Sequence, residues 1–211
     1  MYKISVLLKA TDQPPFRYQG EEAAAEARTR FPTLSGYVQT SPLADQPEVP
    51  FAGALELYFA SVEALSIGDV DALLTDGTTA ACAVTGAERV VMCKPEFRVR
   101  DSIKGVYPFR RKPGLSVEAF QHYWWHTHGP IAAQTQAALA YTQLHVLPGC
   151  YETGEPVFDG ITEIYWPDRA AAERAVASRQ MIDNQGADAA NFVDLQSVVL
   201  FYAEEDILIA P

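Results

Sequence analysis

The chain has 211 residues, a length that suits one large domain or two small ones. Its 16 Lys and Arg against 27 Asp and Glu give a formal net charge of −11, a sign that opposes binding to nucleic acid phosphates or to anionic membranes. The apolar fraction of 48% and the charged fraction of 20% are typical of a folded globular protein and not of a disordered chain.

Cysteine spacing and hydropathy exclude further classes of protein. The three cysteines, Cys82, Cys93 and Cys150, contain no Cys-x-x-Cys pair, so the sequence predicts neither a disulfide framework nor a zinc ribbon. No apolar run approaches the roughly 18 residues of a membrane span. Residues 1–9 alternate like a strand and are too short for a signal peptide, so we expect a protein of the cytoplasm.

Periodicity then predicts the elements of the first half in chain order. Alternation over residues 2–9 indicates a strand, and the spacing of Ala23, Ala27 and Phe31 indicates a helix over 20–31. Two strands are predicted next, over 34–41 and 53–60, and a Pro-rich loop separates them. A helix over 62–74 and a strand over 84–93 complete the first half.

The second half repeats this order. The predicted elements are a strand over 103–111, a helix over 116–128 that continues beyond Gly129-Pro130, strands over 140–147 and 158–166, a helix over 168–181 and a strand over 195–203. Each half therefore has the order β-α-β-β-α-β, which is that of the ferredoxin-like unit.

A sequence repeat supports two related halves. The segments 51–59 and 158–166 share the pattern Phe-x-Gly-x-x-Glu-aliphatic-Tyr-aromatic, 107 positions apart (158 − 51), and Lys3 and Lys104 occupy the first strand of each half. A ferredoxin-like sheet has helices on one face only, so its other face needs a cover. We therefore predict an α+β fold in which the two repeats pack sheet-to-sheet into one pseudo-symmetric α+β barrel, with a ligand cavity inside it. Dimerisation of whole barrels stays open.

The chemistry is concentrated in the second half. Three of the four histidines, His122, His126 and His128, lie within one predicted helix together with Trp124 and Trp125. The equivalent stretch of the first half, residues 21–26, has no histidine and no aromatic residue. We therefore expect residues 1–97 to form a degenerate ferredoxin-like half and residues 98–211 to carry the functional site.

This second half resembles the EthD family of the dimeric α/β-barrel superfamily. The resemblance depends on a basic strand end with Pro-Gly-Leu-Ser over 109–116, on Phe120 and Tyr123-Trp124, and on His128-Gly129-Pro130. It covers about residues 103–206, whereas residues 1–95 share only the repeat. The resemblance implies a ferredoxin-like barrel and a small, mostly apolar organic ligand. Relatives by fold include cofactor-free monooxygenases, cyclases, isomerases, dehydratases and haem-binding proteins, so the fold alone does not define the reaction.

Two residues are the candidate catalytic groups. His128 is the first choice, because an imidazole can exchange a proton near neutral pH; the alternative is a histidine that only caps the helix end. Glu163 is the second choice, and its repeat partner is Glu56. If both carboxylates faced the barrel interior they would form a pair, whereas the alternative is a structural role in ion pairs or hydrogen bonds.

Aromatic and polar residues on the predicted strands and helix are candidates to bind the substrate. They are Tyr107, Tyr123, Trp124, Tyr141, His145 and Tyr165, with ordinary core packing as the alternative for each. His122 and His126 share a helix face, but nothing completes a ligand set, so we predict no metal site.

These features predict a cofactor-independent enzyme that transfers protons on a small aromatic or polyketide-like substrate bound in the barrel. Dehydration, isomerisation, cyclisation or decarboxylation would each fit, which indicates a lyase or an isomerase. The alternatives are a non-catalytic binding protein for a hydrophobic metabolite and a haem-binding monooxygenase.

Overall fold

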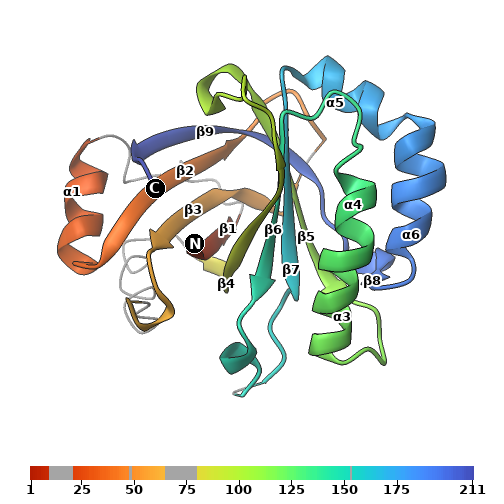
Figure 1. Ribbon diagram of the computed structural model, residues 1–211. Helices are drawn as coiled ribbons and strands as arrows, with labels where there is room; N and C mark the ends of the chain where they lie inside the picture. The colour runs from red at the N-terminus through yellow and green to blue at the C-terminus, as the bar shows by residue number, and fades with distance from the viewer. Residues whose placement is uncertain (10–20, 48, 65–79, 153) are drawn as a thin grey trace.

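In the part of the chain that the structure describes, eight long strands and the helices outside them form the body of the molecule (Figure 1). The computed structural model describes residues 1–9, 21–47, 49–64, 80–152 and 154–211. The long strands are β1 (Tyr2–Lys9), β2 (Leu34–Pro42), β3 (Phe51–Phe59), β4 (Ala80–Cys93), β5 (Ile103–Arg111), β6 (Ala140–Val146), β7 (Gly160–Trp166) and β9 (Phe201–Ile209). The short strand β8 (Val193–Asp194) pairs with the end of β5.

The strand pairings confirm two ferredoxin-like repeats closed into one barrel. The first repeat has the spatial order β4-β1-β3-β2, and the second has β6-β7-β5-β9. Antiparallel pairing of β2 with β9 and of β4 with β6 joins the two sheets along both edges. Every edge of the long strands is thereby paired, which removes the exposed edges that an isolated sheet would present.

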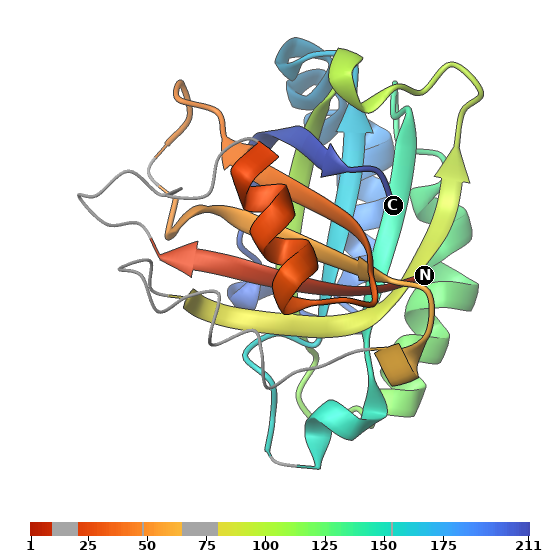
Figure 2. The same ribbon diagram turned by 90° about the vertical axis from the view of Figure 1, so that its left-hand side faces the viewer.

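Helices cover the outside of the barrel on two sides. Figure 2 shows α1 (Glu21–Arg30) across the strands of the first repeat, with the helices of the second repeat on the far side. Those helices are α3 (Val117–Tyr123), α4 (Gly129–Ala132), α5 (Arg169–Val176) and α6 (Ala187–Ala189), with π-helical segments over Trp124–His128 and Gln180–Gly186. Short 3₁₀ turns occur at Val62–Ala64, Val99–Asp101, Pro148–Tyr151 and Leu195–Ser197. None of the described helices is long and apolar enough to cross a membrane.

Two predicted elements need comment. Most of the helix expected over 62–74 lies outside the described residues, which include only the turn at Val62–Ala64. The last strand, expected over 195–203, instead spans Phe201–Ile209. Leu195 and Val198, within the expected range, line a pocket instead. The observed strand contains the acidic run 204–206, which weakens its apolar pattern. Glu205 of this run pairs with Lys104 inside the barrel.

Side chains alternate between the barrel interior and the helices. On β1, Ile4, Val6 and Leu8 pack with the described residues of α1, whereas Leu7 belongs to a cluster that draws on both repeats. That interior cluster comprises Leu7, Phe51, Ala54, Val84, Val106, Leu144, Val146, Phe158, Ile161, Phe201 and Ala203. The space between the two sheets is therefore largely occupied by the protein's own side chains.

Candidate active site

The helix that carries the histidine motif begins at a clear cap and contains a π-helical segment. Ser116 accepts a hydrogen bond from the backbone N–H of Ala119, as a helix N-cap does. From Trp124 to His128 the helix is π-helical, and the N–H of Gly129 bonds to the carbonyl of Trp124. Because Phe120, Trp124 and His128 are spaced by four residues, all three lie buried on the face toward the sheet. Such π segments are frequent at functional sites.

His128 is held by a carboxylate on α6. Its Nδ1 lies 2.8 Å from Oδ2 of Asp188, and the hydroxyl of Tyr123 donates to Oδ1 of the same carboxylate at 2.7 Å. The pKa of Asp188 is lowered, since these hydrogen bonds outweigh the opposing effect of burial. An ionised carboxylate can only accept, so Nδ1 of His128 carries the hydrogen.

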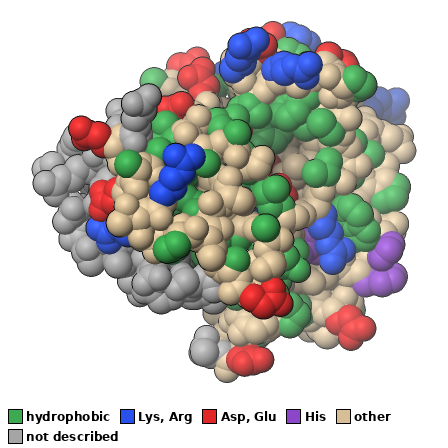
Figure 3. Space-filling model, turned by 60° about the vertical axis from the view of Figure 1, so that its left-hand side comes forward, with side chains coloured by type: hydrophobic (Ala, Val, Ile, Leu, Met, Phe, Trp, Pro, Cys, Tyr) green, Lys and Arg blue, Asp and Glu red, His purple; other side chains and the backbone are tan. Residues whose placement is uncertain are grey.

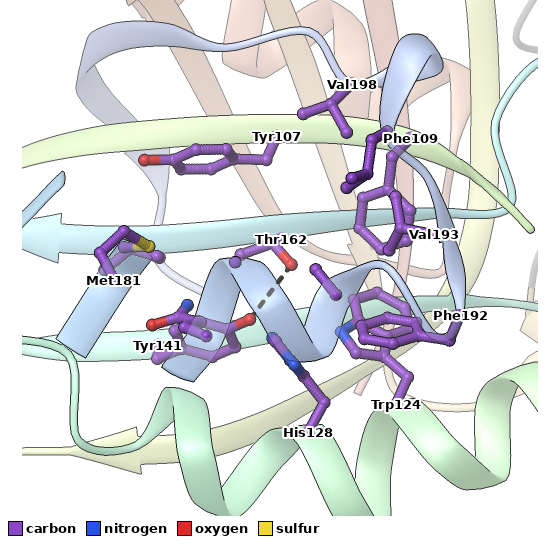
Figure 4. A pocket seen from close by; sticks show the side chains of 15 residues that line it. Tyr107, Phe109, Trp124, His128, Tyr141, Thr162, Met181, Phe192, Val193 and Val198 are labelled. Carbon is purple, nitrogen blue, oxygen red and sulfur yellow. Dashed lines mark hydrogen bonds between the residues drawn. The ribbon is translucent and has the colours of Figure 1, made fainter. Parts of the chain in front are cut away.

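The environment of His128 favours the neutral imidazole. Burial lowers its pKa below the usual value, and Asp188 opposes this effect only in part. With the hydrogen on Nδ1, the lone pair is on Nε2, to which none of the described residues is hydrogen-bonded. Figure 4 shows the imidazole directed into a pocket between Tyr141 and Trp124. This arrangement is that of a general base oriented by a carboxylate.

The pocket lies between the second sheet and its helices, outside the barrel. Its volume is about 170 Å³, and its walls are mainly apolar and aromatic (Figure 4). The lining residues are Tyr107, Phe109, Trp124, His128, Tyr141, Thr162, Ile164, Met181, Gln185, Gly186, Ala189, Phe192, Val193, Leu195 and Val198. The expectation that the site with His128 lies inside the barrel is therefore wrong. Alternation alone did not distinguish the two faces, because each strand is covered on both.

Two predicted tyrosines line this pocket, and their hydroxyl groups differ in hydrogen bonding. The hydroxyl of Tyr141 shares a hydrogen bond of 3.3 Å with Oγ1 of Thr162. The hydroxyl of Tyr107 is buried, and no described residue is hydrogen-bonded to it. Burial raises the pKa of Tyr107 well above its usual value and that of Tyr141 to about 12, so both remain protonated at neutral pH.

The other aromatic candidates support the pocket or lie beside it. Trp124 lines the pocket with one face and stacks on His145, with ring centroids 4.3 Å apart. His145 is not among the lining residues; its Nε2 bonds to Gln143, whose amide donates to the carbonyl of Trp124. Burial lowers the pKa of His145 to about 3, so it is neutral. Tyr123 acts on the pocket indirectly, through Asp188.

The structure separates Glu163 and Tyr165 from His128. Both face the barrel interior, where Nζ of Lys3 lies 2.7 Å from Glu163 and 3.3 Å from Glu56. Lys104 bonds to the same two carboxylates and to Glu205, which also accepts from the hydroxyl of Tyr165 at 3.0 Å. Glu163 thus belongs to a buried ion-pair network, the structural alternative for this residue, and does not share a pocket with His128.

The remaining histidines are at the surface. His122 and His126 are exposed, with ring centroids 4.5 Å apart, and exposed histidines are visible at the right of Figure 3. In the part of the chain that the structure describes, no group of three His, Cys, Asp or Glu side chains is placed to hold a metal ion.

Several residues of the candidate site carried no sequence signal. Asp188 lies in a three-residue helix, about sixty positions after His128, without a motif around it. Phe192 packs against His128 with centroids 4.8 Å apart, and Gln185 lines the pocket from the second π-helical segment. A search for a carboxylate partner of His128 would have found many candidates in so acidic a chain, so only the fold identifies Asp188.

Comparison with known proteins supports the fold and the family. The family model for the EthD domain matches residues 112–196, and none of the curated proteins matches the chain. Among solved structures, an anthrone oxidase-like protein is similar at a TM-score of 0.58 and 13% identity, over 98% of this chain and 92% of that one.

Two further structures are similar over nearly the whole chain. A dye-decolorizing peroxidase of Bacteroides thetaiotaomicron VPI-5482 has a TM-score of 0.56 at 10% identity, over 96% of this chain and 92% of its own. A chlorite dismutase mutant of Candidatus Nitrospira defluvii has a TM-score of 0.55 at 11% identity, over 96% and 90%. At such identities the likeness shows the fold alone. The segment that matches the EthD domain model lies in the second of two ferredoxin-like repeats, which together form a single α/β barrel.

Proposed function

We propose that this protein is an enzyme that transfers protons on a small, mostly apolar organic substrate, with His128 as the general base. The observation that carries this proposal is the His128–Asp188 pair at the wall of an apolar pocket. A buried imidazole with its Nδ1 held by a carboxylate presents Nε2 to whatever the pocket binds. A protein that only bound a hydrophobic ligand would need the apolar walls but not this pair.

The pocket limits the size of the substrate. Its volume of about 170 Å³ is close to the roughly 150 Å³ of a protein cavity that holds benzene. One six-membered ring with small substituents therefore fits, whereas a fused multi-ring substrate would require the helices to move. Within the aromatic or polyketide-like class, the geometry favours a single ring.

The pocket does not fit a haem. His128 has the chemistry of an axial ligand, because a carboxylate holds its other nitrogen. A porphyrin, however, is larger than the drug-sized ligands whose pockets measure roughly 300–1,000 Å³, and this pocket has about 170 Å³. We therefore assign the proton transfer to the chain's own residues.

Oxidation is a second candidate, favoured by the similarity in fold to an anthrone oxidase-like protein and to a peroxidase. Removal of a proton by His128 would also activate a substrate carbon toward an oxidant. An isomerase or lyase reaction requires only the proton transfer itself, for which the site has an oriented base in His128.

The isomerisation of cyclohex-3-en-1-one to cyclohex-2-en-1-one tests this proposal. A base removes a proton from C2 and the proton returns to C4, so the reaction needs no oxidant, and the conjugated product is followed by its ultraviolet absorbance. We expect the protein to accelerate the reaction over buffer and His128→Ala to lose roughly 10²–10⁴-fold in rate.

His122→Ala is the matched control, because it removes an exposed histidine from the same helix. It should retain the wild-type rate. A wild-type protein without acceleration, or a His128→Ala variant that is as fast as wild type, would contradict the proposal.

A further inference from the structure

A buried glutamine joins the first π-helical segment to strand β6. The side chain of Gln143 is fully buried, and its Nε2 donates to the carbonyl of Trp124 at 3.2 Å. This carbonyl also accepts from the N–H of Gly129, five residues on, whereas in an α-helix the donor would be the N–H of the fourth residue. Gln143 therefore binds the helix at the carbonyl where its register changes.

Donors and acceptors in this contact fix the orientation of the Gln143 amide. The carbonyl of Trp124 can only accept, so Gln143 presents its NH₂ group to the helix and its Oε1 to His145, whose Nε2 lies 2.8 Å away. Nε2 of His145 therefore carries the hydrogen. The same imidazole stacks on the Trp124 ring, so two residues of one face of β6 hold both the backbone and the side chain of Trp124.

The position of His128 depends on the register of this segment. His128 follows Trp124 by four residues, and Figure 4 shows both side chains extending from this helix toward the pocket. In the α-helical register, His128 would be turned around the helix axis relative to Trp124. The hydrogen bond of 2.8 Å between its Nδ1 and Asp188 would not survive that rotation, because hydrogen bonds weaken steeply as their geometry departs from the optimum.

We infer that Gln143 is a positioning residue, which holds the Trp124 carbonyl and thereby keeps the π-helical register that places His128 against Asp188. The effect on catalysis rests on the proposed function of His128, whereas the effect on the position of His128 requires no substrate. Gln143 is not among the residues that line the pocket, so it acts on a bound ligand only through the helix.

The tautomer of His128 tests the inference without any substrate. In the wild type Nδ1 carries the hydrogen because it donates to Asp188, whereas a neutral imidazole without such a partner favours the hydrogen on Nε2. Gln143→Met keeps the length of the side chain and removes its donor, so His128 should shift from the Nδ1–H to the Nε2–H tautomer. The nitrogen NMR chemical shifts of the ring measure this change.

Gln121→Met is the matched control. Gln121 lies on the same helix before the π-helical segment, and its Nε2 donates to the carbonyl of Val146 on β6 at 2.7 Å. Each variant thus loses one amide–carbonyl hydrogen bond between this helix and this strand. Gln121→Met should keep the hydrogen on Nδ1 of His128. The inference is overturned if Gln143→Met keeps it too, or if both variants lose it.

Binding and turnover separate positioning from contact with the substrate. Gln143→Met should lower kcat for cyclohex-3-en-1-one by roughly 10²-fold, the cost of a reacting group misplaced by about 1 Å. Its affinity for cyclohexanone, the saturated analogue of that substrate, should change much less, because the apolar walls of the pocket remain. NMR titration of the pocket's aromatic resonances measures this affinity. An affinity that falls as steeply as kcat would contradict a positioning role.

Hydrogen exchange in the wild type decides the question if Gln143→Met does not fold. The side-chain amide of Gln143 and the ring N–H of His128 should then exchange with equal protection, because one opening of the segment exposes both. Exchange of the His128 N–H while the amide stays protected would overturn the inference.

The outcomes distinguish this inference from the proposed function. If Gln143→Met shifts the tautomer of His128 but the wild type does not accelerate the isomerisation, the positioning role stands and the proposed function fails. If His128→Ala is inactive while Gln143→Met keeps both the Nδ1–H tautomer and the wild-type kcat, the proposed function stands and the positioning role fails.

Discussion

At the scale of single residues, the site depends on the balance of two effects on His128. Burial disfavours the charged imidazole, and the carboxylate of Asp188 favours it; burial has the larger effect, so the pKa is below its usual value. A base must be neutral, so kcat/KM should rise as the pH increases through this lowered pKa and be constant above it.

Substitution of Asp188 tests this balance. In Asp188→Asn the charge that raises the pKa of His128 is gone while burial remains, so the midpoint of the pH profile should move to lower pH. The rate on the plateau should also fall, because an amide can hold the imidazole in either tautomer. An NMR titration of the imidazole measures the midpoint, and exposed His126 is the internal reference. An unchanged or higher midpoint would show that Asp188 does not control the base.

The histidine motif and the alternation on the strands predicted His128, Tyr107 and Tyr141, and all three line the pocket. No sequence signal marked Asp188, since its contact with His128 joins elements about sixty residues apart. The sequence also grouped Glu163 with His128. Glu163 follows the same alternation as Thr162 and Ile164 but in the opposite phase, and only the closed barrel shows which phase faces the pocket.

At the scale of elements, the helix that carries Trp124 packs on a strand whose residue at the contact is a glycine. A Cβ atom at Gly160 of β7 would lie 2.5 Å from Cζ3 of Trp124. The repeat-related Gly53 has a different reason, a φ of 147°, which side-chain-bearing residues rarely adopt. The repeat thus predicted two equivalent glycines, but each position requires glycine for a different physical reason. The π-helical segments had no periodic signal in the sequence.

Gly160→Ala tests this packing. The added methyl group overlaps Trp124, so the variant should lose roughly 1–3 kcal/mol of unfolding free energy, as overpacked cores do. Displacement of Trp124 should also weaken cyclohexanone binding, because its ring is part of the pocket wall. Urea unfolding and NMR titration measure the two effects. Gly149→Ala is the control, since no atom of the described residues lies within 4 Å of its Cβ position. Equal stability of the two variants would refute the packing argument.

At the scale of the whole molecule, the two repeats meet in a buried network of charges. Lys3 and Lys104 each contact Glu56 and Glu163, and each also pairs with a carboxylate of its own repeat, Glu88 or Glu205. The network follows the pseudo-symmetry of the repeats, which explains why a lysine occurs on the first strand of both halves. The barrel was predictable from the repeat, and so was the possibility that Glu56 and Glu163 face its interior. Their partners Lys3, Lys104 and Glu205 were not predicted, because charged residues normally mark the solvent side of a strand.

The network makes stability depend on pH. Burial and the neighbouring Glu56 raise the pKa of Glu163 from 4.5 to about 7. The stability linked to this group is therefore fully present below pH 4.5 and is lost as the pH rises through about 7. The pKa of Glu56 is lowered instead, against the effect of burial, mainly by Lys104 and Lys3, so its contribution is lost only in more acidic solution.

Glu163→Gln should consequently flatten the pH dependence of stability between about pH 4.5 and 7. Urea unfolding at several pH values within that window measures it, with exposed Glu152→Gln as the control. A variant that loses stability with rising pH as steeply as wild type would show that Glu163 is not the group that titrates.

The central claim is that the ligand binds between the second sheet and its helices, beside His128 and Tyr107, and not inside the barrel. A crystal structure of the protein with cyclohexanone tests this most directly. We predict the ring in the pocket walled by Phe109, Trp124 and Phe192, beside the imidazole of His128. A ketone found instead among Lys3, Lys104 and Glu163, with the pocket of His128 unaltered, would contradict it.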